Sequence, residues 1–166
     1  MELSSASYFF ALAALSMAFV GFTSVVVVLY QSTGKQLSSL HILLTRLFVE
    51  LGLMATAFSM LAPTLAVCGF QIDQVWRISS AIMLATMVPW FGFYPVRRKA
   101  AAPNDRLPLR WYVMTVIGLC TTVFLSLNLV GWLVIPGPAP LAIATVFVLS
   151  YATVAYIGTY SLFTKG

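Results

Sequence analysis

Long apolar runs separated by short polar segments dominate the chain. No charged residue lies between Glu2 and Lys35, and none lies between Arg110 and Lys165. A helix needs about 20 apolar residues to cross a bilayer core of about 30 Å, and the apolar runs reach or exceed that length. The pattern predicts five membrane-spanning helices, at residues 8–30, 40–69, 75–95, 111–135 and 141–163.

Prolines mark where these runs must break or bend. Pro136, Pro138 and Pro140 fall within five positions of the last apolar run, and proline disrupts a helix interior because it lacks the backbone N–H. That run is therefore expected to form two antiparallel helices. Pro63 and Pro89 lie inside predicted spans, where each should bend its helix.

Composition places most of the chain in lipid. Of its 166 residues, 61% are hydrophobic and 8% are charged, whereas a soluble domain has about a quarter of its residues charged. So few charges cannot cover a surface that faces water. The predicted fold class is all-α: a polytopic transmembrane helix bundle of about five spans, with residues 1–166 as a single transmembrane domain.

Basic residues gather in one predicted loop, at residues 96–110. This loop carries five of the nine lysines and arginines, namely Arg97, Arg98, Lys99, Arg106 and Arg110. By the positive-inside rule it faces the cytoplasm, which puts the N-terminus outside and the C-terminus in the cytoplasm, across a bacterial inner membrane. The loop is expected to attract anionic lipid headgroups. Nucleic acid is not an expected partner, because no aromatic residues interleave with these charges.

Charges inside predicted spans are costly and therefore mark candidate sites. Arg46 and Glu50 lie four residues apart on the second predicted helix, where they share a face and can pair. One interpretation makes Glu50 a titratable carboxylate inside the bundle that couples to protons or cations. The other makes the two residues an interfacial ion pair, because residues 39–69 exceed the length needed to cross. Asp73 and Arg77 have the same spacing, and we expect an ion pair between them at the outer interface.

Three further side chains join Arg46 and Glu50 in a candidate intramembrane polar site: Asn128, Tyr156 and Tyr160. Asn128 should find a partner and fix the register of its helix, because helices in lipid use such side chains for cross-helix hydrogen bonds. Tyr156 and Tyr160 share one side of the last helix, where they either line a polar cavity or belong to the core.

Small residues form helical stripes that favour close packing between helices in lipid. On the first predicted helix, Ala14, Ala18, Gly21 and Val25 recur at helical spacing, and this face is expected to pack against another helix. A comparable stripe on the fourth predicted helix consists of Thr115, Gly118, Thr122 and Ser126.

The chain contains no recognisable catalytic or cofactor motif. It has no Gly-x-Ser-x-Gly, His-Glu-x-x-His or Cys-x-x-Cys sequence, and its one histidine, His41, cannot supply a bis-histidine haem site. Cys68 and Cys120 are expected at different depths, as small apolar side chains without a bridge. We therefore expect no catalytic residue, no bound metal and no cofactor.

One segment resembles known sequences. Residues 18–26, Ala-Phe-Val-Gly-Phe-Thr-Ser-Val-Val, are similar to the opening helix of small, uncharacterised bacterial membrane proteins with several spans. The resemblance covers the first helix and implies a membrane location without an assigned activity.

Three function classes remain open. The first is a non-catalytic membrane protein that acts through helix–helix contacts, as a subunit, sensor or assembly module, either in a homo-oligomer or with another membrane protein. The second is an oligomeric channel, or a proton- or cation-coupled transporter of small solutes, that uses Glu50. The third is a lipid-modifying enzyme, for which Glu50 and His41 are the available acid–base groups.

Overall fold

The computed structural model describes residues 5–32, 39–103, 109–131 and 136–163, and all regular secondary structure in these residues is helical. Each of the helices is long and apolar enough to cross a membrane, which confirms the predicted transmembrane bundle. Their bounds are α1 (Ala6–Ser32), α2 (Ser39–Val67), α3 (Ile72–Ala101), α4 (Leu109–Val130) and α5 (Pro138–Phe163).

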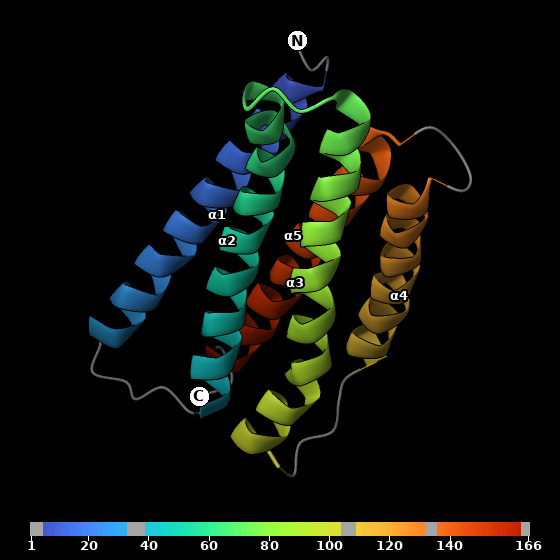
Figure 1. Ribbon diagram of the computed structural model, residues 1–166. Coiled ribbons are helices and arrows are strands. Elements are labelled where there is room, and N and C mark those ends of the chain that lie inside the picture. The colour runs from blue at the N-terminus through green and yellow to red at the C-terminus, as the bar shows by residue number, and fades with distance from the viewer. Residues whose placement is uncertain (1–4, 33–38, 104–108, 132–135, 164–166) are drawn as a thin grey trace.

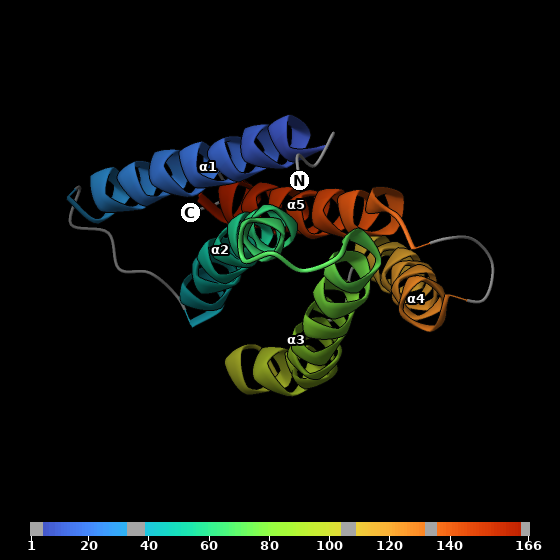
Figure 2. The same cartoon turned by 45° about the horizontal axis from the view of Figure 1, so that its top comes forward.

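Successive helices run in alternating directions, so the bundle has two distinct ends (Figure 1). We call the end that holds the α2–α3 turn and the start of α1 the turn end. At the opposite end, the basic end, α3 finishes with Arg97, Arg98 and Lys99. Helices α1 and α4 lie at opposite edges, with α2, α3 and α5 between them (Figures 1 and 2).

The centre of the bundle is filled by apolar side chains. Helices α2 and α5 pack most extensively on each other, α1 packs on α2, and α4 packs on α3 and α5. The outward faces are apolar as well, as Phe22 and Leu119 illustrate with 63% exposure each. Large apolar faces on both the inside and the outside are what a helix bundle in lipid requires. Fully buried core residues include Phe48, Leu51, Met83, Leu125 and Val148.

A glycine closes the turn between α2 and α3. Gly69 has a φ of 86°, a left-handed conformation that costs other residues about 1–2 kcal/mol. Its N–H donates to the Ala66 carbonyl at 3.1 Å, and the Phe70 N–H donates to the Leu65 carbonyl at 3.3 Å. These are the two bonds of a Schellman motif, which satisfies carbonyls that the end of a helix leaves open.

Helix α5 begins inside the proline-rich segment, before the predicted start at residue 141. Its first residue is Pro138, so Pro138 and Pro140 occupy the first helical turn. The backbone N–H groups there have no helical partner, and proline therefore loses no hydrogen bond. Helix α4 ends at Val130, with Gly131 at a φ of 71°, and residues 132–135 of the predicted span lie outside the described residues.

Helix α3 continues beyond the predicted span and corrects the predicted basic loop. It runs to Ala101, so residues 96–101 of the expected loop at 96–110 are helical, as are Leu109 and Arg110 at the start of α4. Pro95 lies within α3 and removes one helical hydrogen bond without ending the helix. Beyond Pro95, Arg97 binds Glu50 on α2 and Arg98 lies over Trp111 on α4, and these contacts hold the last turns in place. Residues 104–108 lie outside the described part of the chain.

The small-residue stripe of α1 does not pack against another helix of this chain. Ala14, Ala18, Gly21 and Val25 are all exposed, and a Cβ atom added to Gly21 would meet no atom within 4 Å. The predicted contact with another helix is therefore not made within this chain. The buried side of α1 is the opposite face, where large and small residues together form the contact with α2: Phe9, Leu12, Ala13, Ser16, Val20 and Thr23.

Candidate functional site

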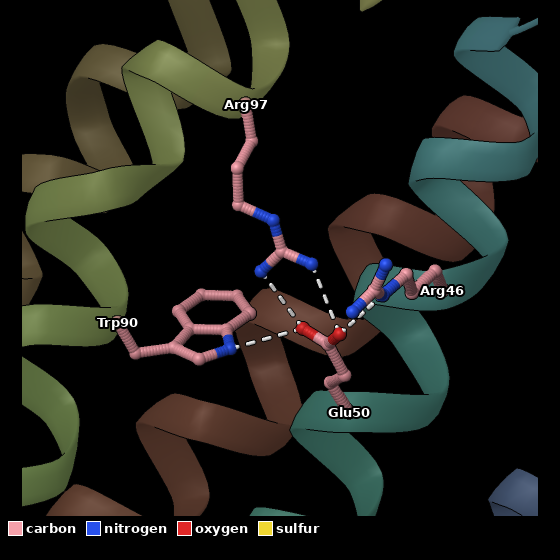
Figure 3. A network of polar contacts seen from close by, with 4 residues as sticks. All are labelled: Arg46, Glu50, Trp90 and Arg97. Atoms are coloured by element: carbon pink, nitrogen blue, oxygen red, sulfur yellow. Dashed lines mark hydrogen bonds and ion pairs between the residues drawn. The ribbon is translucent and has the colours of Figure 1, made fainter.

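The Glu50 carboxylate on α2 is surrounded by donors from two helices (Figure 3). Its Oε1 accepts hydrogen bonds from Arg46 Nε at 2.6 Å and from Arg97 Nη2 at 2.9 Å. Its Oε2 accepts from Arg97 Nη1 at 2.9 Å and from Trp90 Nε1 at 3.1 Å. We call these four residues the Glu50 clamp.

Helical spacing explains how four residues converge on one carboxylate. Arg46 and Glu50 are four residues apart on α2 and therefore share a face. Trp90 and Arg97 are seven residues apart on α3, which places them on one side two turns apart. Since α2 and α3 are antiparallel neighbours, these two faces meet in the half of the bundle toward the basic end.

In the clamp, one carboxylate forms ion pairs with two guanidinium groups. Arg97 binds the carboxylate with both terminal nitrogens, the fork geometry that makes arginine–carboxylate pairs strong and directional. Glu50 and Arg97 each expose 27% of their side chain, whereas Arg46 exposes 69%. Arg97 also lies over the Trp90 ring, 6.0 Å from its centroid. The cross-helix bonds to Arg97 and Trp90 are thus the sheltered part of the clamp, and Arg46 is the exposed part.

The clamp leaves the carboxylate little capacity for other chemistry. An ionised carboxylate has about four lone-pair sites for hydrogen bonds, and four donor contacts reach Glu50 here. This arrangement fits a fixed link between α2 and α3 better than a group that exchanges protons or binds a cation. The Arg46–Glu50 pairing expected from the sequence is present. The sequence did not predict Trp90 and Arg97 as partners of Glu50. Arg97 was placed in a loop, so it was not expected to lie on the same helix face as Trp90.

A second group of contacts joins α3 to α4 and α5 at the basic end. The Arg98 side chain is 5% exposed, and its guanidinium lies 5.9 Å from the ring centroid of Trp111. Trp111 in turn stacks on Tyr94 with ring centroids 5.0 Å apart and meets Tyr151 edge-on at 5.1 Å. Sequence reasoning treated Arg98 as a loop residue and Trp111 as a helix boundary, so it did not predict this cluster.

Asn128 links three segments near the turn end. Its amide nitrogen donates to Ser80 Oγ on α3 at 2.8 Å, and its side-chain oxygen accepts from the Gly137 N–H at 3.0 Å. The side chain is 7% exposed. The amide therefore ties α4 to α3 and to the segment that leads into α5, as expected for an asparagine that fixes helix register.

The remaining candidates do not assemble into one polar site. Tyr156 packs in an aromatic cluster with Phe19 and Phe48, at centroid distances of 6.3 and 5.7 Å, which matches the core interpretation of this residue. The side chain of Tyr160 lies outside the described residues. Asn128 belongs to the contacts near the turn end, whereas Arg46 and Glu50 belong to the clamp.

The expected ion pair between Asp73 and Arg77 is not formed. Within the described part of the chain, the ion pairs are those of the Glu50 clamp. Arg77 instead extends to the end of α4, where a Cβ atom added to Gly131 would lie 2.8 Å from Arg77 Nη2. A cation at the C-terminus of a helix is stabilised by the partial negative charge of the open carbonyls, which offers Arg77 an alternative to Asp73.

Other chemistry-bearing residues are dispersed. In the described residues, no group of three or more histidines, cysteines or acidic residues could hold a metal ion. Cys68 and Cys120 are both free and exposed, and the side chain of His41 lies outside the described residues. No protein-family model, curated protein sequence or solved structure matches this chain.

Proposed function

We propose that this protein is a non-catalytic membrane protein that acts through helix–helix contacts within the bilayer, as a subunit, sensor or assembly module. The observation that carries the proposal is the outward face of α1. Ala14, Ala18 and Gly21 form a small-residue stripe that the rest of the chain leaves exposed. Helices in lipid associate where small residues let two backbones approach closely. The partner is therefore a membrane-spanning helix of a second protein molecule.

The clamp supports the non-catalytic part of the proposal. Glu50 is the acidic residue inside a span that a transporter or an acid–base enzyme would use. Its oxygens already accept hydrogen bonds from Arg46, Trp90 and Arg97. A carboxylate held in this way stabilises the bundle, and a transport cycle would have to break several of these bonds at each turnover.

A bacterial inner membrane, with the basic end in the cytoplasm, is part of the same proposal. What supports the cytoplasmic placement of the basic end is the charge asymmetry of the described residues: Arg97, Arg98 and Lys99 lie together there. Asp73 lies at the start of α3, at the turn end. Cytoplasmic segments carry the excess of lysine and arginine.

Bulky substitutions on α1 test the proposal. We expect Ala18→Leu and Gly21→Leu to remove a protein partner, of the same or another kind, that the native protein retains when it is released gently from its own membrane. Native mass spectrometry measures this directly. Ala85→Leu on α3 is the matched control, because Ala85 is also exposed and lies within a helix.

The outcomes separate the function classes. Retention of the partner by both α1 variants, or absence of any partner in the native protein, would contradict the proposal. If Glu50→Gln abolished solute or proton flux in vesicles while the protein stayed folded, the transporter alternative would replace it.

A further inference from the structure

A cavity of about 340 Å³ opens between α3 and α4, with α5 behind it. Its volume lies within the range of roughly 300–1,000 Å³ found for small-molecule sites. It is lined on α3 by Met87, Val88, Phe91, Gly92, Tyr94 and Pro95, on α4 by Met114, Thr115, Gly118, Leu119 and Thr122, and on α5 by Tyr151. We call it the α3–α4 groove.

Two glycines line the groove, and their surroundings differ. A Cβ atom added to Gly92 would meet nothing within 4 Å, so the α3 side is open at this point. A Cβ atom added to Gly118 would lie 3.0 Å from the ring of Phe147, which shows how closely α5 backs the α4 side. The groove is therefore hollow toward α3 and tightly backed by α5.

The lining suits an apolar chain. Thr115 and Thr122 use their hydroxyls to donate to carbonyls of their own helix, at 2.9 Å each, and so turn little hydrogen-bonding capacity toward the groove. Val88 and Leu119 line the groove and are also exposed at the outer surface of the bundle, at 53% and 63%. Both belong to apolar spans, so the surface around the groove is one that faces lipid tails.

A cation, Lys99, lies on the same face of α3 as the groove, near the basic end of this helix. Val88, Gly92, Pro95 and Lys99 follow one another at intervals of four, three and four residues, which keeps them on one helical face. Lys99 is exposed and lies one turn beyond Pro95, at the basic end. Its neighbours on α3 are engaged elsewhere, because Arg97 binds Glu50 and Arg98 lies over Trp111.

From this juxtaposition we propose that the α3–α4 groove binds an anionic phospholipid, with one acyl chain along the groove and the headgroup phosphate at Lys99. The apolar groove accounts for the chain, and the cation one helical turn beyond it accounts for the negative headgroup. This inference is independent of the proposed role of α1, since the groove lies between α3 and α4, and α1 and α4 lie at opposite edges of the bundle (Figure 2).

The test is lipid retention by the purified full-length protein. The native protein is reconstituted with equal amounts of phosphatidylglycerol and phosphatidylcholine of identical chains, then transferred to mild detergent and analysed by native mass spectrometry. We expect one retained lipid per protein, enriched in phosphatidylglycerol. A lysine near the surface contributes about 1 kcal/mol toward an anionic lipid, which corresponds to an enrichment of roughly fivefold.

Two kinds of variant divide the site into its parts. Gly92→Leu places a side chain into the open space and should abolish retention of both lipids, and Thr115→Leu should do so from the α4 side. Ala57→Leu on α2 is the matched control, because Ala57 is exposed within a helix and does not line the groove, and it should retain the lipid. Lys99→Gln should keep the lipid but lose the preference for phosphatidylglycerol.

Each part of the proposed lipid site has a result that would overturn it. Retention that is unchanged in both groove variants would overturn the acyl-chain site, and circular dichroism of each variant separates this result from misfolding. A preference for phosphatidylglycerol that survives Lys99→Gln would overturn the headgroup assignment. Displacement of the bound lipid by glycerol phosphate alone would show that the anion, without the chain, is the ligand.

Discussion

The Glu50 carboxylate belongs to α2, a helix that is long and apolar enough to cross a membrane, and an isolated charge in lipid is costly. The protein offsets this cost with two guanidinium groups and an indole N–H, all within 3.1 Å of the carboxylate oxygens. Of these donors, Arg97 matters most for the fold. It comes from a different helix and uses its planar fork, which a lysine cannot reproduce.

We predict that the two sides of the clamp differ in their contribution to stability. Glu50→Gln and Arg97→Gln should each lower the free energy of unfolding by about 1–3 kcal/mol, because each breaks charge-assisted bonds between helices and leaves a partly buried partner. Arg46→Gln should cost less than about 0.5 kcal/mol, because its pair is largely exposed. Denaturant titration in one detergent measures all three.

The double variant Glu50→Gln/Arg97→Gln provides the internal control for this prediction. It should cost less than the sum of the single variants, since neither partner is then left as an unpaired charge. A cost that is additive would mean that Glu50 and Arg97 stabilise the protein independently and that the clamp is not a unit.

Residue chemistry could be predicted from the sequence where the partners lie close along the chain. The Arg46–Glu50 pair follows from a spacing of four on a helix. Arg97 lies 47 residues from Glu50 and Trp90 lies 40, so their contacts depend on how α2 and α3 dock. The one local clue was that Trp90 and Arg97 are seven apart, which places them on one face if the helix continues past Pro95.

At the scale of helices, apolar runs were sufficient to predict the five elements but not which faces they bury. On α1 the sequence offered a stripe of small residues and a face of larger ones, and both patterns are compatible with packing in lipid. The structure buries the larger face, with Phe9, Leu12 and Val20, and exposes Gly21. Composition alone could not decide this, because lipid and protein core are both apolar.

Helices α1 and α2 approach each other closely at Gly52, and we predict that this contact is sensitive to a single methyl group. A Cβ atom added to Gly52 would collide with Cγ2 of Val20, and a β-branched side chain cannot rotate freely to make room. Gly52→Ala should therefore lower the free energy of unfolding by about 1–3 kcal/mol, the usual cost of overpacking. Thermal or denaturant unfolding measures the change.

The companion change is Val20→Ala, which removes the obstructing methyl groups. In the double variant Gly52→Ala/Val20→Ala, the added methyl group occupies the vacated space, so the loss should be smaller than the two single losses combined. Gly21→Ala controls for helix propensity, because a Cβ atom there meets nothing within 4 Å. If the double variant were as unstable as the sum, the helices would not touch at this point.

For the whole molecule, the sequence predicts an orientation as well as a fold. Alternating helices put the start of α1 and the end of α5 on opposite sides of the membrane (Figure 1), and the cations at the end of α3 favour the cytoplasm for the basic end. The helices themselves are compatible with either orientation, because each is apolar along its span. Orientation therefore needs a chemical measurement from one side of the membrane.

The native cysteines make that measurement direct. Cys68 is exposed at the turn end, just after α2, whereas Cys120 is exposed within the span of α4. Maleimides react with the thiolate, which requires water, so a Cys120→Ser variant should be labelled at Cys68 by a membrane-impermeant maleimide in intact spheroplasts. A Cys68→Ser variant, which keeps Cys120 in lipid, should stay unlabelled.

In a variant without native cysteines, Ser32→Cys at the exposed end of α1 should be labelled only after permeabilisation. The reverse pattern, with Cys68 protected and the residue at position 32 accessible, would place the basic end outside and show that the charges at the end of α3 do not set the topology.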